Sequence, residues 1–205
     1  RALEATRLRQ ENAELRTRAG RNTDLIGESA PMTALRGEIE RVAPTNSRVM
    51  VSGPPGSGKE VVARNLHDQS RRAGGPFIVV SAATIEPDRM ELELFGEEAR
   101  QESAGGPRKI GLLERAHGGT LFLDEVSDMP VQTQNKILRV LLDQTFQRIG
   151  GSRPVSVDVR VISSTSRDLP QLVEDGLFRG DLFHRLNVVP INVPPLRRVR
   201  EDIPA

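Results

Sequence analysis

A glycine-rich stretch ending in a lysine, residues 53–59, has the residue types needed to bind phosphate. It follows the apolar run 49–51 and opens a stretch with helical periodicity. In that setting glycines let successive backbone N–H groups turn inward, and the start of the helix adds partial positive charge. A plain turn from strand to helix is the alternative. The stretch is predicted to be a phosphate loop formed by Gly53, Pro54, Pro55, Gly56, Ser57, Gly58 and Lys59, with the lysine reaching the outer phosphates.

A pair of carboxylates, Asp124 and Glu125, ends another apolar run at residues 120–123. Asp124 is predicted to hold Mg²⁺, directly or through water. Glu125 is predicted to polarise the water that attacks the γ-phosphate of ATP. A helix-capping acidic pair is the alternative interpretation. Two adjacent carboxylates favour hydrolysis over transfer to a bound acceptor, so a small-molecule kinase is disfavoured.

These motifs must be positioned by strands and helices, and the apolar runs indicate where those lie. Runs rich in apolar residues predict strands at 49–51, 77–80, 120–123, 157–164 and 188–193. Helical patterns separate them at 59–69, 90–94, 110–116 and 131–142. Such strands, alternating with helices, are typical of the α/β class: a parallel five-stranded sheet with helices on both faces.

The first 20 residues carry a short heptad pattern. Ala5 and Asn12 fall at a positions, and Leu8 and Leu15 at d positions. An Asn at an a position favours a parallel two-stranded register. The pattern predicts a linker helix over residues 1–20 that forms a short coiled coil, with a solvated connector helix as the alternative. Residues 21–205 would then form the main domain.

Composition excludes several classes of protein. The 205 residues carry a formal net charge of +1, which gives no global basicity for nucleic acid or an acidic membrane surface. With no cysteine, disulfide scaffolds, thiolate catalysis and cysteine-based zinc sites are ruled out. No run approaches the ~20 apolar residues that a bilayer span needs, and the first residues do not resemble a signal peptide. We therefore expect a cytoplasmic protein without a membrane partner.

Motifs at 53–60, 93–96, 118–125 and 177–187 together closely resemble the AAA+ domain of sigma-54-dependent transcriptional activators, the NtrC family. The resemblance runs from about Leu25 to the end of the chain and implies the fold of an AAA+ P-loop NTPase. In that family Glu normally follows the loop lysine, where the general pattern has Ser or Thr, and here Glu60 stands there. Residues 197–203 resemble the entry to the family's helical lid, which would be truncated.

The resemblance also implies roles for residues outside the phosphate loop. Leu25, Ile26 and Gly27 would pack near the adenine. Arg179 and Arg185 match the family's arginine fingers, which enter the neighbouring subunit's site and make hydrolysis depend on assembly. A surface ion pair is the alternative for each arginine. Assembly would give a homo-oligomeric ring, a hexamer, that is a dimer when inactive.

Further partners implied by the resemblance act through domains outside this chain. A receiver domain before it would be phosphorylated by a sensor kinase, and a helix-turn-helix domain after it would bind DNA. The family's sigma-54 contact loop reads Gly-Ala-Phe-Thr-Gly-Ala, whereas residues 100–105 read Arg-Gln-Glu-Ser-Ala-Gly. Without the Phe-Thr pair, the usual contact with sigma-54 RNA polymerase is not expected.

Two departures lie nearer the nucleotide. Ser81 stands where family members have the Asn that switches the catalytic glutamate, and Ser166 stands where they have the second residue of a Thr-Asn sensor. The leading prediction is an ATP-hydrolysing AAA+ module of a bacterial two-component transcription regulator of the nitrogen-regulation type. The alternative is a nucleotide-gated oligomerisation module that tunes DNA binding, with little hydrolysis and no sigma-54 remodelling.

Overall fold

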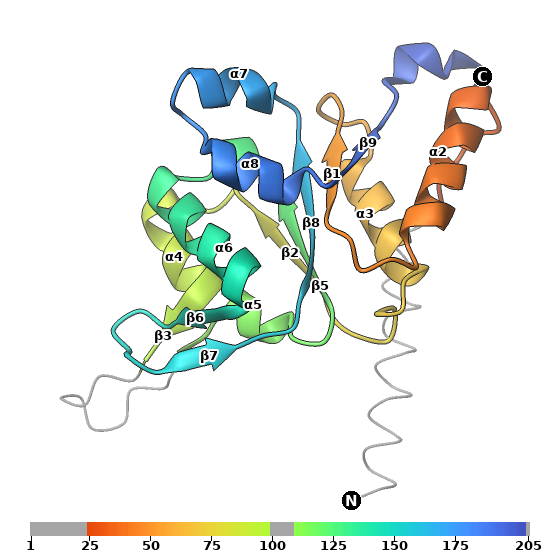
Figure 1. The fold of residues 1–205 in the computed structure, drawn as a ribbon. Coiled ribbons are helices and arrows are strands. Elements are labelled where there is room, and N and C mark those ends of the chain that lie inside the picture. Colours follow the sequence, from red (N-terminus) through yellow and green to blue (C-terminus); the bar gives the residue numbers. More distant parts are fainter. Residues whose placement is uncertain (1–23, 99–108, 204–205) are drawn as a thin grey trace, which may run out of the picture.

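A computed structural model of the chain describes residues 24–98 and 109–203 (Figure 1). The linker helix predicted for residues 1–20 and the loop at 100–105 lie outside these residues. Within the described ranges, no helix combines the length and apolar character needed to cross a bilayer.

The centre of the fold is a five-stranded sheet in which every neighbouring pair is parallel. Its strands stand in the order β2 (Phe77–Ser81), β5 (Thr120–Asp124), β8 (Arg160–Thr165), β1 (Val49–Ser52) and β9 (Val189–Asn192). The parallel five-stranded sheet predicted from the apolar runs is therefore confirmed. All carboxyl ends of its strands lie at one edge, next to the loop that joins β1 to α3 (Figure 1).

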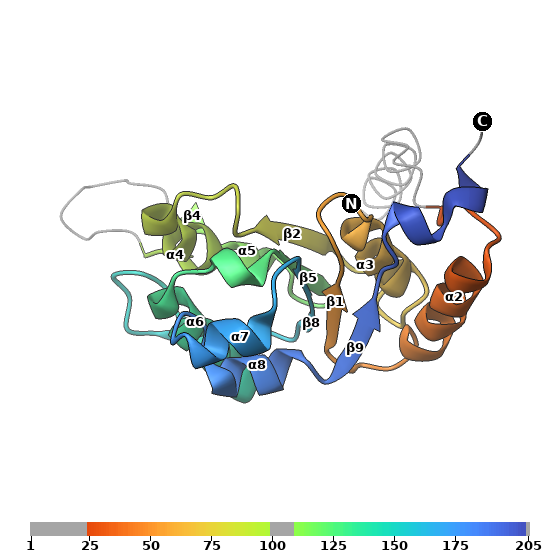
Figure 2. The same ribbon diagram turned by 90° about the horizontal axis from the view of Figure 1, so that it is seen from above.

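Helices cover both faces of this sheet, and Figure 2 shows the two groups on opposite sides. One group consists of α2 (Ala30–Val42) and α3 (Lys59–Asp68). The other consists of α4 (Pro87–Phe95), α5 (Leu112–Arg115), α6 (Val131–Asp143), α7 (Leu169–Glu174) and α8 (Gly180–Leu186). The short 3-10 helices are η1 (Val126–Asp128), η2 (Leu196–Arg198) and η3 (Arg200–Asp202).

The inner strands β1 and β5 are largely apolar because their alternate residues serve two separate cores. Val49 and Val51 pack with α2 and α3, whereas Met50 between them packs with the helices of the opposite face. In β5, Phe122 joins the first core while Leu121 and Leu123 join the second. Burial on both faces is the physical reason that these strands show no alternation of polar and apolar residues.

The structure corrects the helix predicted over residues 110–116. Its first residues form β4 (Lys109–Ile110), which pairs with β3 (Gly96–Glu97), and α5 begins only at Leu112. The reason is a close approach at Gly111, where an added Cβ would lie 2.4 Å from the Leu94 carbonyl oxygen. A second small sheet, β6 (Thr145–Gln147) with β7 (Pro154–Ser156), was also not predicted.

Candidate functional site

The phosphate loop occupies the turn between β1 and α3, and its backbone geometry requires glycine. Gly56 and Gly58 have φ angles of 75° and 89°, in the left-handed region that disfavours other residues. At Gly53, a Cβ would lie 2.8 Å from the Ser57 hydroxyl and 3.0 Å from the Val193 carbonyl oxygen. Because no other residue fits these positions without strain, the loop has the compact shape that a phosphate-binding turn needs.

Lys59 begins α3, and its side chain folds back over the loop with only 6% of its surface exposed. Its ammonium donates to the carbonyl oxygens of Gly53 at 3.1 Å and Pro54 at 3.3 Å. The ammonium also forms an ion pair with Glu125 Oε1 at 2.9 Å. A buried ammonium thus lies at the mouth of the loop, held by groups that a phosphate could replace.

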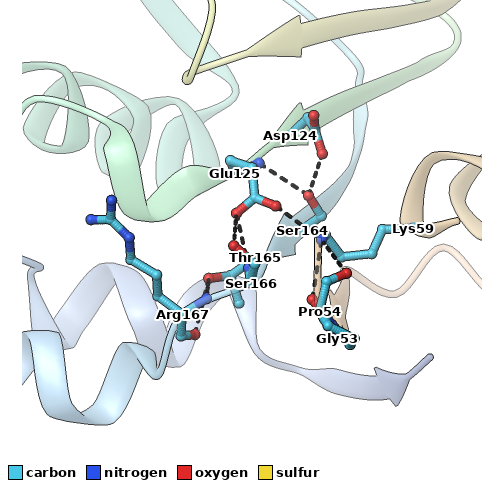
Figure 3. A network of polar contacts seen from close by, with 9 residues as sticks. All are labelled: Gly53, Pro54, Lys59, Asp124, Glu125, Ser164, Thr165, Ser166 and Arg167. Carbon is cyan, nitrogen blue, oxygen red and sulfur yellow. Dashed lines mark hydrogen bonds and ion pairs between the residues drawn. The ribbon is translucent and has the colours of Figure 1, made fainter. Parts of the chain in front are cut away.

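Asp124 ends β5 and Glu125 follows it, and both are bound to residues at or just after the end of β8 (Figure 3). The Ser164 hydroxyl donates to Asp124 Oδ1 at 2.6 Å and accepts the Glu125 N–H at 3.0 Å. Glu125 Oε2 accepts both the N–H of Ser166 at 2.8 Å and its hydroxyl at 2.9 Å. The two predicted acids and the predicted lysine therefore belong to one polar network.

The electrostatics of this network keep Glu125 ionised. Burial acts to raise the pKa of Glu125, but hydrogen bonds from Lys59 and Ser166 outweigh it and hold the pKa below its ordinary value. The residue also has a φ of 52°, an uncommon value for a non-glycine residue. Glu125 precedes η1 but makes no capping hydrogen bond with its side chain. The arrangement suits a catalytic base better than a helix cap.

The switch position on β2 does not hold Glu125 in this arrangement. Ser81 pairs with Asp124 in the sheet register, next to the acids. Both oxygens of Glu125, however, are bound by Lys59 and Ser166. The side chains that contact the glutamate thus come from α3 and from the residue after β8, not from β2.

Residues near the loop fit a magnesium nucleotide. The Ser57 hydroxyl is buried without a hydrogen-bond partner among the described residues, so it is available to a phosphate oxygen. Ser164 orients Asp124 through Oδ1, and no described residue donates to Oδ2, which leaves that oxygen for a metal ion. Glu60, by contrast, pairs with Arg64 along α3 at 2.7 Å.

An apolar cavity of about 400 Å³ adjoins the phosphate loop. It contains the predicted adenine contacts Leu25 and Ile26 and touches the loop at Ser57 and Gly58. Gly27 lies beside this cavity rather than in its lining. Sequence reasoning missed the other wall, which comes from the segment after β9 and consists of Val193, Pro194, Leu196, Val199, Asp202 and Ile203. Only the resemblance of residues 197–203 to a lid entry pointed to this segment.

The two predicted finger arginines lie at the two ends of α8, and neither bonds to the network of Lys59 among the described residues. Arg179 precedes the helix, and its guanidinium binds both carboxylate oxygens of Asp181, at 2.9 and 2.7 Å. Arg185 is exposed in the last turn of α8. Burial and the like charge of Arg185 lower the pKa of Arg48, which places the two guanidiniums near each other. The network of Lys59 and the arginines are therefore not brought together within one chain.

The sequence of this chain matches a known protein family and several characterised relatives. Over residues 25–192 the chain matches the family described as Sigma-54 interaction domain. It is 56% identical over 204 residues to the nitrogen assimilation regulatory protein NtrX of Azorhizobium caulinodans, covering 100% of this chain and 44% of that protein. It is 48% identical over 185 residues to the DNA-binding transcriptional regulator NtrC of Escherichia coli K12, covering 90% of this chain and 39% of that protein.

Solved structures agree with these relatives. The crystal structure of NtrX from Brucella abortus in complex with ADP has a TM-score of 0.86 and 59% identity, covering 98% of this chain and 44% of that chain. Its complex with ATP has a TM-score of 0.85 and 56% identity, covering 98% and 42%. The present chain spans less than half the length of these relatives.

Proposed function

The chain belongs to the sigma-54 interaction domain family, whose members are AAA+ domains, and we propose that it binds ATP with Mg²⁺ and hydrolyses it to ADP and phosphate. The observation that carries this proposal is the convergence of Lys59, Asp124 and Glu125 at one edge of the sheet. The apolar cavity beside Ser57 and Gly58 has the position needed for the base. We place this module in a nitrogen-regulation type two-component regulator.

The proposed reaction begins with an exchange of partners at Lys59. The γ-phosphate takes the place of Glu125 Oε1 on the ammonium, so that this carboxylate oxygen becomes free to accept a proton. Ser166 keeps Oε2 in place during the exchange. Glu125 takes a proton from water, the water oxygen bonds to the γ-phosphorus, and the bond to the bridging oxygen breaks to release ADP. Asp124 would hold Mg²⁺, which supplies charge neutralisation when bound.

We propose that hydrolysis needs a second copy of the chain. The proposal is supported by the contacts of Arg179 and Arg185, since neither bonds to the network of Lys59 in its own subunit and Arg185 is exposed to solvent. A guanidinium arriving from outside stabilises the charge on the transferring phosphoryl group. The pairing of Arg179 with Asp181 would have to open on assembly. The assembly we expect is a hexameric ring formed from inactive dimers.

A second candidate function is favoured by the ion pair between Lys59 and Glu125. Because the base is bound to the phosphate-binding lysine, the chain could bind ATP as a signal for assembly and DNA binding while hydrolysing it slowly. Turnover per subunit, measured against protein concentration in the full-length protein, separates the two functions. A cooperative rise supports the hydrolysing ring, whereas a flat, low line supports nucleotide gating.

Nucleotide binding itself is tested by Lys59→Ala. At about 100 times its Kd, ATP should add roughly 2.7 kcal/mol to the stability of the wild type. Because the chain has no Trp and no Tyr, the shift is read by calorimetry or a dye-based melt. Lys59→Ala should erase the shift, and Lys136→Ala, which changes an exposed lysine on α6, should keep it. A shift that survives in Lys59→Ala would refute the phosphate loop.

The remaining partners are proposals that rest on the family. We infer that the protein acts in the cytoplasm. We also infer that a sensor kinase phosphorylates it on a receiver domain and that it binds DNA through a helix-turn-helix domain. We also propose that it does not open sigma-54 promoters by the family's usual loop contact, because residues 100–105 lack an aromatic anchor. ATP-dependent open complexes with sigma-54 polymerase, as abundant as those of a relative with a Phe-Thr loop, would contradict this.

A further inference from the structure

The cavity beside the phosphate loop gathers three of the most exposed large apolar side chains among the described residues. Ile26 is 70% exposed, Leu196 64% and Ile203 53%, and all three line this one cavity. Side chains of this kind leave water favourably when a flat, apolar ligand lies between them. They come from segments at opposite ends of the described chain, so something must hold the two segments together.

Asp202 makes the connection from the segment after β9. Its Oδ1 accepts the backbone N–H groups of Glu28 at 2.8 Å and Ser29 at 2.9 Å. Its Oδ2 accepts the Ser29 hydroxyl at 2.5 Å. One carboxylate thus binds three donors of the other segment, and these hydrogen bonds hold the pKa of Asp202 below its ordinary value.

Arg36 holds the same segment by its carbonyl groups. Its Nη2 donates to the carbonyl oxygen of Leu25 at 2.6 Å and also to that of Gly27. The carbonyl groups of the segment are therefore fixed by a guanidinium on α2, while its N–H groups are fixed by a carboxylate on η3. Both charged side chains bind main-chain groups of the segment, and the Ser29 hydroxyl adds the one side-chain contact.

Gly27 shows how closely the two segments approach. Its φ of 113° lies in a region that other residues rarely adopt. A Cβ added there would lie 2.4 Å from both Cγ and Oδ2 of Asp202. The Asp202 carboxylate thus packs against the main chain at a position where only glycine leaves room for it.

We propose that Asp202, together with Arg36, is a positioning residue for the base of the nucleotide. Asp202 assembles the base-binding cavity by tying the wall of Leu25 and Ile26 to the wall of Leu196 and Ile203, and it takes no part in holding the phosphates. This inference rests on the proposed binding of ATP. It makes the segment after β9 part of the nucleotide site, so that its position and base binding depend on each other.

The test compares a ligand that has a base with one that lacks it. Binding of ATP and of inorganic tripolyphosphate is measured by calorimetry on the full-length protein and its variants. Asp202→Asn should weaken ATP about tenfold, a factor in line with loss of charge-assisted hydrogen bonds, and leave tripolyphosphate unchanged. The matched control is Glu201→Gln, the exposed acid next to it, which should change neither ligand.

If Asp202→Asn weakens both ligands equally, or neither, the inference is overturned. Should Asp202→Asn fail to fold, Ser29→Ala removes only the donor to Oδ2 and should weaken ATP severalfold without affecting tripolyphosphate; an unchanged ATP affinity there also overturns the inference. Lys59→Ala should weaken both ligands, and if it weakens neither, it is the proposed function that has failed.

Discussion

The two ends of the candidate nucleotide site are built in different ways. At the phosphate end, a contiguous loop and two adjacent acids meet through side chains of Lys59, Glu125 and Ser166. At the base end, an apolar cavity is closed by hydrogen bonds that Asp202 accepts from main-chain N–H groups 173 and 174 residues earlier. The phosphate end thus joins short motifs that can each be recognised in the sequence, while the apolar pocket at the base end is closed by contacts between distant segments that carry no such motif.

The difference extends to how each end responds to a ligand. At the phosphate end, a nearly buried ammonium and a carboxylate with 17% of its side chain exposed satisfy each other, so a phosphate must displace a partner. At the base end, exposed apolar side chains have no partner to lose. We therefore expect the phosphate end to control turnover and the base end to control affinity for the nucleoside.

The largest expected effect comes from residues that lie at neither end in their own subunit. Arg179→Ala and Arg185→Ala should each lower ATP turnover about 10³-fold, because each removes a guanidinium supplied to the neighbour's phosphate end. Binding of ATP should persist, since both ends are complete within one chain. Steady-state hydrolysis and calorimetry on the full-length protein check this, with Arg41→Ala, an exposed arginine on α2, as the control.

Mixing experiments separate action between subunits from a structural role. Protein carrying Arg179→Ala has a sound phosphate loop, whereas protein carrying Lys59→Ala has sound arginines. Mixed rings should regain part of the ATPase activity, because the arginines of a Lys59→Ala subunit can then enter the nucleotide site of an Arg179→Ala subunit, whose phosphate loop is intact. No recovery at any mixing ratio would mean that the arginines act within their own subunit or only on the fold.

A smaller loss is expected when the base of the reaction is removed. Glu125→Gln should lower turnover about 100-fold or more, since the amide keeps the shape but cannot accept the proton of water. ATP affinity should stay the same or improve, because Lys59 no longer has a carboxylate as a competing partner. If wild type and variant turn over equally slowly, the gating function replaces the hydrolase.

Substitutions of two glycines, Gly27 at the base end and Gly56 at the phosphate end, test whether the two ends bind their parts of the ligand separately. Gly27→Ala places a Cβ against Asp202, so ATP affinity should fall about tenfold while tripolyphosphate affinity is unchanged. Gly56→Ala meets no atom within 4 Å and changes only a left-handed turn, so both ligands should weaken by a smaller, similar factor. If Gly27→Ala weakened both ligands to the same degree, the two ends could not be treated as separable.

The smallest expected effect is on the acid stability of the nucleotide-free protein. The pKa values of Glu125 and Asp202 both lie below the ordinary range. A carboxyl group with a depressed pKa stabilises the fold above its unfolded pKa of about 4, and this contribution is lost as the pH falls through the folded value. Stability should therefore hold down to about pH 5 and decline below pH 4 or so. Melts across this range should show a shallower decline for Asp202→Asn; identical profiles would contradict a role for its charge.

Much of the fold was predictable from local sequence because inner strands such as β1 and β5 are buried on both faces and read as short, mostly apolar runs. The small sheets β3–β4 and β6–β7 were not, since pairs of two or three residues leave no periodic pattern. Helix α2 was missed as well, although Met32, Leu35 and Ile39 are spaced along one buried face. A search for that spacing alone would have found it.

Within the candidate site, too, some features can be read from a short stretch of sequence and others cannot. Glycines with left-handed φ, a lysine at a helix start and acids at a strand end act through the conformation of adjacent residues, so a short stretch of sequence specifies them. Asp202 and Ser166 act through space: a carboxylate near one end of the chain meets backbone amides near the other, and a serine meets a glutamate 41 residues away. Hydrogen bonds depend on distance and direction, which only the folded arrangement of these segments supplies.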